Sequence, residues 1–196
     1  MSDPLVDADD DAATPLTPEE RAQIIPTYIT ERAQLNEAEQ HNITAADLWA
    51  FKRKRDVLDT DFLLRLHKRM FGKVWKWAGS IRKTERNIGI NPIRISVELR
   101  TLLDDGAYWI KCETYPPDEI AVRFHHRLVL IHPFPNGNGR HARLAADLLT
   151  VRLEQPRFSW GSGNIAKPAA TRAAYITALK AADAHDIAPL RAFARS

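Results

Sequence analysis

Apolar residues along most of the chain recur with the spacing of an α-helix. In the clearest stretch, Ile120, Phe124, Leu128 and Ile131 follow one another at intervals of four, four and three, which places them on one helix face. The same spacing, with the residues that begin and end helices, predicts further helices. They cover residues 17 up to Pro26, 31–40, 44–51, 61–71, 96–110 and 140–154, with a final pair around Tyr175 and Phe193. The chain is therefore expected to be mainly α-helical.

One stretch has a different period. Between Arg86 and Val97, five β-branched residues mostly alternate with other residues around an Asn91-Pro92 pair. Alternation is typical of β-strands, and an Asn-Pro pair favours a turn. This pattern predicts a small β-hairpin in the otherwise helical chain.

The length and composition fit one compact domain. The 196 residues, of which 44% are apolar, are enough to form a core. Residues 1–20 carry seven acidic side chains and no lysine or arginine, whereas the remaining residues have 28 basic and 18 acidic ones, a formal charge of +10. We expect an acidic disordered tail over residues 1–16, a candidate regulatory helical segment over residues 17–43 and the main domain over residues 44–196. The basic body suits a polyanionic ligand.

The cysteine content and the amino terminus indicate the cellular setting. The single cysteine, Cys112, excludes an internal disulfide and a cysteine-based zinc cluster, and it is expected to be a small core residue. The amino terminus has no basic segment followed by an apolar run, and no stretch approaches the ~18 apolar residues of a membrane span. We expect a cytoplasmic protein without a membrane partner.

The residues with the clearest chemistry follow the strongest helical stripe. His132 precedes a proline, so the helix should end there and present an imidazole, whose usual pKa of about 6.5 suits a general base. Gly137 and Gly139 leave backbone N–H groups open to an anion, at the positive end of a helix that starts near Arg140. Arg140 and Arg143 lie three positions apart, on one helix face, and guanidinium groups match phosphate. Together they predict nucleotide chemistry on a hydroxyl group.

Two other interpretations of these glycines are weaker. Asn-Gly pairs are a strong hairpin signal, but no alternating apolar strands flank them here. Residues 137–142 also fit the dinucleotide-binding pattern G-x-G-x-x-A, which requires a strand before it. The preceding segment is helical, and no βαβ unit follows.

Two clusters of charged or titratable residues favour structural roles. The basic run at residues 52–55 has no interleaved aromatic residues, so a solvated helix face is expected rather than a nucleic-acid site. His125, His126, His132 and His141 could be imagined as a metal cluster. However, adjacent helical residues point in different directions and no acid lies at ligand spacing, so structural roles are favoured for the histidines other than His132.

The segment His132-Pro-Phe134-Pro-Asn136-Gly137-Asn138-Gly139-Arg140-His-Ala-Arg143 resembles the signature of the Fic family, His-x-Phe-x-Asp/Glu-Gly-Asn-Gly-Arg-x-x-Arg. The similarity extends through Ala78-Gly79 and Arg82 before the motif and Tyr175-Ile-Thr-Ala-Leu179 after it, and covers roughly residues 44–192. Among branches of the family, the chain is most similar to the small bacterial branch known as mobile mystery protein B, which also carries asparagine at the position of Asn136.

The resemblance implies a Fic-type helical bundle with a small β-hairpin flap. It also implies an enzyme that transfers AMP from ATP to a serine, threonine or tyrosine hydroxyl of a protein and releases pyrophosphate. His132 would be the catalytic base, Arg140 would contact the β-phosphate and Arg143 the γ-phosphate. The implied ATP site comprises Phe134, Asn136, Gly137, Asn138, Gly139, Arg140 and Arg143.

Asn136 is the main departure from the family pattern. In most relatives this position carries an acid whose carboxylate binds magnesium. An amide oxygen can also ligate Mg²⁺, but magnesium is normally held by carboxylates together with substrate phosphates. The resemblance therefore implies ATP and Mg²⁺ as cofactors, with Asn136 as a weaker metal ligand.

The resemblance also implies protein partners. The hairpin expected at Arg86–Val97 corresponds in position to the flap that holds the target segment by strand addition. Many relatives carry an inhibitory glutamate that pairs with the second motif arginine, here Arg143, in a Ser/Thr-x-x-x-Glu-Gly/Asn pattern that this chain does not contain. Glu37 and Glu31 come closest, with Glu37 favoured over Glu31 and a plain surface role favoured for both. A toxin role, restrained by an antitoxin or another partner encoded nearby, is a further implication.

Three functions remain open at this point. The first is AMP transfer to a protein. The second is phosphoryl transfer or AMP removal on the same fold. The third is a weakly active regulatory binding module. The motif histidine and arginines favour catalysis, whereas Asn136 favours the binding module.

Overall fold

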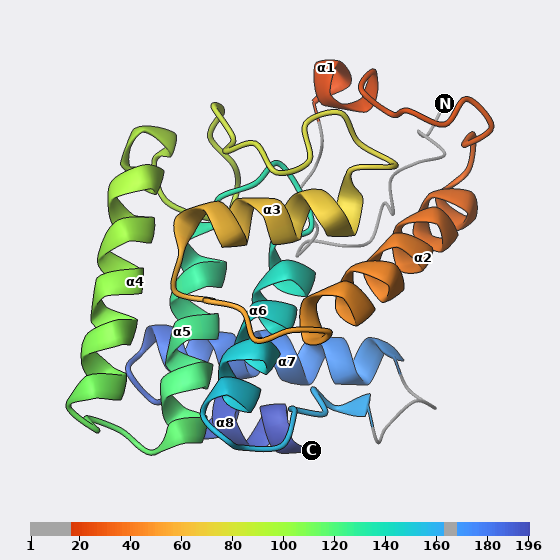
Figure 1. The fold of residues 1–196 in the computed structure, drawn as a ribbon. Helices are drawn as coiled ribbons and strands as arrows, with labels where there is room; N and C mark the ends of the chain where they lie inside the picture. Colours follow the sequence, from red (N-terminus) through yellow and green to blue (C-terminus); the bar gives the residue numbers. More distant parts are fainter. Residues whose placement is uncertain (1–16, 163–167) are drawn as a thin grey trace.

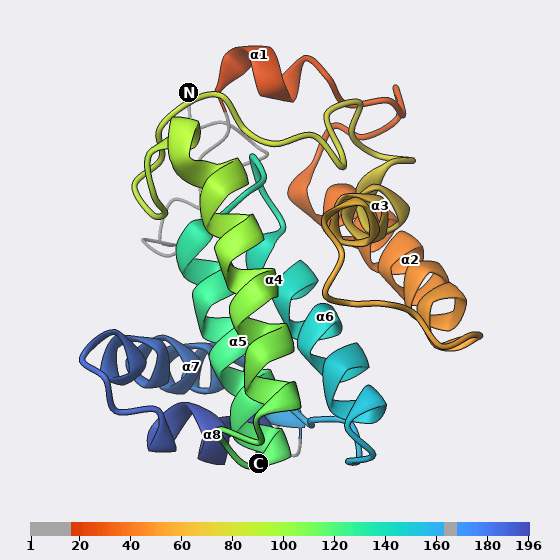
Figure 2. The ribbon, with the colours of Figure 1, turned by 60° about the vertical axis from the view of Figure 1, so that its left-hand side comes forward.

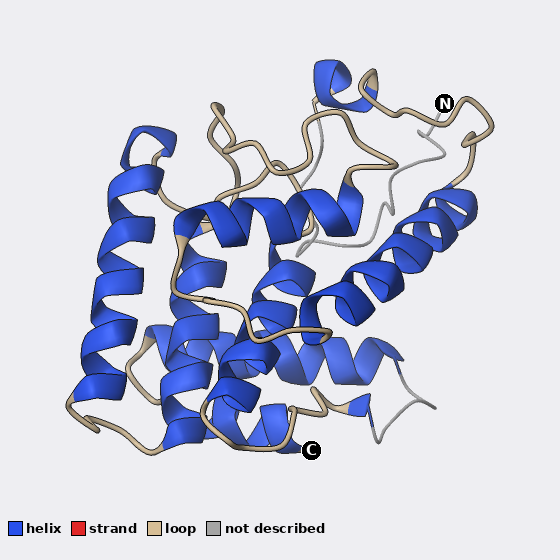
Figure 3. Cartoon of the chain, in the orientation of Figure 1, coloured by secondary structure: helices blue, strands red, loops and turns tan. Residues whose placement is uncertain are grey.

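A computed structural model describes residues 17–162 and 168–196, and this part of the chain is built from helices (Figure 1). They are α1 (Pro18–Arg21), α2 (Arg32–Phe51), α3 (Thr60–Phe71), the 3₁₀-helix η1 (Pro92–Arg94), α4 (Ile95–Lys111), α5 (Pro117–Ile131), α6 (Asn138–Arg152), α7 (Pro168–Asp183) and α8 (Ala188–Arg195). Figure 3 shows no strand in the described residues. The expectation of a mainly helical fold is confirmed, and the acidic tail expected at residues 1–16 lies outside the described residues.

Helix α5 lies at the centre of the fold. It packs against α4 on one side and α6 on the other, and α8 also contacts it. Figures 1 and 2 show α4, α5 and α6 side by side, with α2 and α3 on one side of this group and α7 and α8 at its lower end. Phe124 and Leu128 of α5 are fully or almost fully buried, and each such side chain contributes about 1.5–3 kcal/mol. The site-bearing end of α5 is therefore fixed by the core.

The ends of α5 follow from its sequence. Pro117 occupies the first helical position, followed by Asp118 and Glu119 in the first turn, where the helix dipole favours acids. The helix ends at Ile131 with His132 as its C-terminal cap, as Pro133 requires.

The prediction of a β-hairpin at Arg86–Val97 is wrong. Residues 83–91 form a loop, η1 follows, and α4 begins at Ile95. Asn91 starts a helical turn because its side-chain oxygen accepts the N–H of Ile93 (3.0 Å). Ile95 is fully buried whereas Ile93 and Val97 are exposed, so the alternating pattern is the start of a helical stripe.

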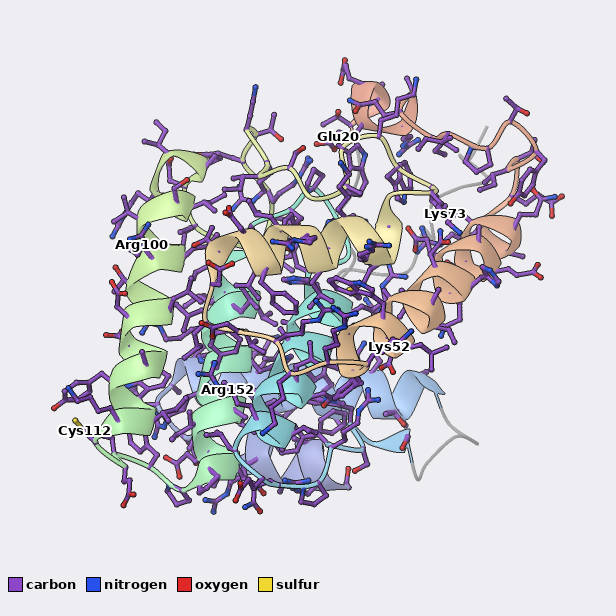
Figure 4. All side chains as sticks on the ribbon, in the orientation of Figure 1. Glu20, Lys52, Lys73, Arg100, Cys112 and Arg152 are labelled. Atoms are coloured by element: carbon purple, nitrogen blue, oxygen red, sulfur yellow. The ribbon has the colours of Figure 1, made fainter. Side chains whose placement is uncertain are left out.

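Two expected helices at residues 31–40 and 44–51 are one helix, α2. The boundary expected between residues 43 and 44 lies inside this helix. Lys52, labelled in Figure 4, is exposed just beyond its end. The prediction that Cys112 is a core residue is also wrong, because Cys112 is exposed at the end of α4.

Helix α1 covers the loop that follows α3. The carboxylate of Glu20 pairs with the guanidinium of Arg86, whose side chain is almost fully buried. The indole N–H of Trp77 donates to the backbone carbonyl of Glu20 (3.3 Å). None of the described helices has both the length and the apolar character that a bilayer crossing needs.

Candidate active site

His132 has an unusual backbone conformation at the end of α5. Its φ of 53° and ψ of 61° lie in the left-handed region, and its side chain and backbone together are only 7% exposed. A non-glycine residue in this region is uncommon and needs support from its surroundings.

Arg82 provides this support. Its Nε donates to the carbonyl of His132 (2.6 Å), and its backbone N–H donates to the carbonyl of Pro133 (2.9 Å). The other guanidinium nitrogens donate to the carbonyls of Thr84 (2.8 Å) and Ile90 (2.5 Å). Arg82 is 2% exposed, so its charge is balanced by backbone carbonyls that belong to both the loop at residues 83–91 and the end of α5.

Gly89 brings this loop into contact with His132. Its φ is +104°, and a Cβ at this position would lie 2.5 Å from the Cβ of His132 and 2.8 Å from Nη2 of Arg82. Only glycine permits so close an approach. The loop therefore forms one wall of the site at His132.

The surroundings of His132 keep its imidazole neutral. Burial, followed by the positive charge of Arg82, lowers the pKa of His132 to about 4, although a hydrogen bond to the backbone of Val129 favours the charged form. At pH 7 the imidazole is thus unprotonated and able to accept a proton.

Phe134 and Asn138 fix the loop between α5 and α6. Phe134 is fully buried. The Asn138 side chain accepts the N–H of Phe134 through Oδ1 (2.9 Å) and donates to the carbonyl of Phe134 through Nδ2 (2.8 Å). Both ends of the amide are used, so the loop has one defined shape.

The two motif glycines lie at the start of α6. Gly137 has a φ of +78°, and a Cβ there would lie 2.6 Å from the ring of Phe71. At Gly139 the nearest atom to such a Cβ would be the Tyr175 hydroxyl, 3.8 Å away, which leaves this side of the backbone open. The first turn of α6 leaves backbone N–H groups without intrahelical partners, at the positive end of its dipole. The arrangement suits an anion.

Arg140 and Arg143 both line the cavity next to this helix end. Arg140 lies 4.9 Å above the ring of Phe71, and Arg143 lies 5.4 Å from the ring centre of Tyr175. Burial lowers the pKa of Arg143 from its usual value, but a guanidinium stays charged in proteins. The sequence-predicted base, glycines and arginines therefore come together in one place.

Glu39 of α2 is the site residue that the sequence analysis missed. It is 5% exposed, accepts the indole N–H of Trp75 (2.6 Å) and pairs with Arg140 (2.7 Å). Within the described residues, neither Glu31 nor Glu37 bonds to a motif arginine. The first is the exposed N-terminal cap of α2 and the second is an exposed residue. The buried residues of α2 (Leu35, Glu39, Asn42, Ala46 and Ala50) recur at helical spacing, a signal that could have identified Glu39.

A cavity of about 960 Å³ connects these groups. Its walls come from the ends of α5 and α6, from α7, and from Arg32 and Asn36 of α2. A pocket of this size can hold a nucleotide. Asn136 also lines it, with its Oδ1 accepting the N–H of Gly137 (2.5 Å).

The donor set for a metal is small. No group of three or more histidine, cysteine or acidic side chains in the described residues could hold a metal ion. Among the residues that line the cavity, Asp183 carries the one carboxylate, and it contacts His126 (2.8 Å). An amide oxygen has a second lone pair, so Asn136 fits Mg²⁺ only as a single weak ligand.

The remaining motif-region histidines have separate partners. His125 Nε2 lies 3.1 Å from the Tyr175 hydroxyl, and His141 Nε2 lies 3.0 Å from the carbonyl of Leu63. Burial lowers the pKa of His125 to about 3 and that of His141 to about 4. Both rings are therefore neutral structural groups at pH 7.

Comparison with known proteins links the site to one family. Residues 57–150 match the model of the Fic/DOC family. The chain is 32% identical over 145 residues to the protein adenylyltransferase fic-1 of Caenorhabditis elegans, covering 70% of this chain and 26% of that protein. It is 31% identical over 145 residues to the protein adenylyltransferase Fic of Drosophila melanogaster, covering 72% of this chain and 28% of that protein. The chain thus spans about a quarter of the length of these relatives.

Solved structures show the same fold. A Bartonella tribocorum BepC protein with bound AMPPNP superposes with a TM-score of 0.69 at 17% identity, covering 91% of this chain and 97% of that chain. A fragment of C. elegans Fic-1 gives a TM-score of 0.64 at 26% identity, covering 87% and 50% respectively.

The pKa of His132 is the first testable consequence of this geometry. Titration of its Cε1–H resonance by NMR should give a pKa of about 4. In the urea-unfolded chain the value should be about 6.5. Because the unfolded chain binds this proton more readily, His132 should lower the free energy of unfolding as the pH falls from about 6.5 towards 4. A native pKa near 6.5 would contradict the burial of a neutral base.

Proposed function

The chain belongs to the Fic/DOC family, and on this premise we propose that it is a protein adenylyltransferase that moves AMP from ATP to a serine, threonine or tyrosine hydroxyl of a target protein. The names of the C. elegans and D. melanogaster relatives support this activity. Since the chain corresponds to about a quarter of those proteins, the proposal rests mainly on the geometry of its own site.

One observation carries the proposal. A neutral imidazole, His132, shares a cavity with the open N-terminal turn of α6 and with Arg140 and Arg143. A proton acceptor next to a site for several negative charges is what attack of a hydroxyl on a nucleotide requires.

ATP is proposed to bind with its phosphates at the start of α6. The backbone N–H groups around Gly137 and Gly139 and the helix dipole attract phosphate oxygens. Arg140 would bind the β-phosphate and Arg143 the γ-phosphate, which places the α-phosphate towards His132. The AMPPNP bound to the similar BepC structure supports this class of ligand.

The proposed reaction is an in-line displacement at the α-phosphorus. The oxygen of the target hydroxyl forms a bond to this phosphorus while His132 accepts the hydroxyl proton. The bond between the α-phosphorus and the oxygen that bridges to the β-phosphate breaks, and pyrophosphate leaves with that electron pair. Arg140 and Arg143 stabilise the charge that develops on the leaving group.

Mg²⁺ is proposed to accompany ATP. The metal would supply electrostatic stabilisation of phosphate charge, held mainly by the phosphates, with Asn136 as the one loop side chain able to contribute an oxygen. The protein would therefore bind the metal more weakly than a site with a carboxylate at the same position.

The target segment is proposed to enter along the loop at residues 83–91. Gly89 lies over His132 and Ile88 lines the cavity, so a bound segment at this loop would bring a hydroxyl to the imidazole. In this chain an irregular loop would take the place of the hairpin, and recognition would depend on single backbone contacts and on side chains.

Glu39 is proposed to restrain the enzyme from within the segment at residues 17–43. Its carboxylate forms an ion pair with the guanidinium of Arg140 (2.7 Å). The same guanidinium must bind a phosphate during the reaction. A partner protein that restrains toxicity would act in addition to this contact.

Transfer of radioactive label from ATP to lysate proteins tests the proposed function. Label on the α-phosphate should reach a protein band, and His132→Ala should reduce this transfer by roughly a hundredfold or more, the usual contribution of a general base. Label on the γ-phosphate should not be transferred.

Two other results would favour a named alternative to AMP transfer. Label that arrives only from the γ-phosphate would make the protein a phosphotransferase. No transfer even after the Glu39 restraint is removed, while ATP still binds, would favour AMP removal, a binding module or an absent partner.

The Glu39→Gln variant tests the restraint. Glutamine keeps an oxygen for the Trp75 N–H but removes the charge that holds Arg140. A charge-assisted hydrogen bond contributes about 1.5–3 kcal/mol, so ATP affinity and transfer should rise by roughly tenfold. Glu37→Gln, an exposed change in the same helix, is the control and should have no effect. A fall in transfer for Glu39→Gln would mean that Glu39 positions Arg140 instead of restraining it.

A further inference from the structure

His67 of α3 lies beneath the loop that connects α5 and α6. It is fully buried, and its ring stacks on Phe134 at a centroid distance of 3.7 Å and an angle of 16°. It does not line the cavity. Nevertheless, both of its ring nitrogens make hydrogen bonds, and one of these reaches the phosphate-binding loop.

The two partners determine which nitrogen of His67 carries the hydrogen. The backbone N–H of Gly79 donates to Nδ1 (2.9 Å), so Nδ1 has no hydrogen. Nε2 therefore carries it and donates to the backbone carbonyl of Asn136 (3.0 Å). Burial, with the neighbouring His141, holds the pKa of His67 well below its usual value. The ring stays neutral, as this arrangement requires.

The bond to Asn136 controls more than one atom. A peptide unit is planar, so fixing the carbonyl of Asn136 also fixes the direction of the Gly137 N–H. That N–H bonds to the side chain of Asn136, and α6 begins at the next residue. Phe71, one turn further along α3, lies directly under Gly137. Helix α3 thus forms a floor for the start of α6.

We propose that His67 is a positioning residue, whose Nε2–H fixes the Asn136-Gly137 peptide and thereby aims the first turn of α6 at the phosphates of ATP. This inference rests on the proposed function for the identity of the ligand. The position of the loop itself can be tested without any ligand.

Two conservative variants separate the two hydrogen bonds of His67. The amide nitrogen of glutamine is as many bonds from Cβ as Nε2, so His67→Gln keeps a donor for Asn136 and loses the acceptor for Gly79. The side chain of asparagine reaches only as far as Nδ1, so His67→Asn keeps an acceptor for Gly79 and loses the donor. Each variant loses one buried hydrogen bond, and both should lower the melting temperature by a similar amount.

Hydrogen exchange by mass spectrometry, without nucleotide, is the first measurement. Amides of residues 134–140 should exchange about tenfold faster in His67→Asn than in the wild type, because the loop loses its bond to α3. His67→Gln should match the wild type in this segment. Leu102→Ala, a core change in α4, controls for general loss of stability. It should not reproduce the faster exchange of residues 134–140 that is expected of His67→Asn.

Calorimetric titration with ATP is the second measurement. His67→Asn should bind ATP about tenfold more weakly, whereas His67→Gln should stay within about twofold of the wild type. Where transfer is measurable, the loss should appear in the KM for ATP with a smaller change in kcat. Equal exchange and equal ATP affinity in the two variants would overturn the proposal. If the exchange differs but neither the wild type nor Glu39→Gln transfers AMP, the proposed function fails and the positioning role stands.

Discussion

The buried guanidinium of Arg82 is the interaction on which the rest of the site depends. It bonds to the carbonyl of His132 and to carbonyls of the loop at residues 83–91. His132 lies in a strained, left-handed conformation, and Arg82 stabilises the carbonyl that this conformation turns away from α5. The same charge disfavours protonation of the imidazole. Geometry and protonation of the proposed base thus have one common cause.

Opposing electrostatic effects meet where α5 ends and α6 begins. The negative end of the α5 dipole favours a protonated His132 by about 0.3–1 kcal/mol. Burial and the nearby arginines act in the opposite direction and are stronger, because the pKa falls to about 4. At α6 the dipole, the open N–H groups and two arginines act together to attract anions. The site thus pairs a neutral proton acceptor with a strongly positive phosphate site, and Glu39 offsets part of the positive charge.

The sequence predicted those parts of the site that are local. His132, the two glycines and the two arginines lie within one short segment, and helix periodicity correctly placed this segment at the end of one helix and the start of the next. The hairpin was wrong because β-branched residues that alternate can equally begin a helical stripe, as Ile95 does. Glu39 and His67 were missed because their partners lie far away in the sequence, and their hydrogen bonds exist only after α2 and α3 pack against α6.

The central claim is that the first turn of α6 binds the triphosphate with the α-phosphorus facing His132. A crystal structure of the full chain with a non-hydrolysable ATP analogue and Mg²⁺ tests it most directly. Phosphate oxygens should lie within hydrogen-bond distance of the N–H groups of Asn138 and Gly139 and of both motif arginines. The α-phosphorus should lie close enough to His132 for a hydroxyl to fit between them. A nucleotide whose base occupies the start of α6, or whose γ-phosphate faces His132, would contradict this mode of binding.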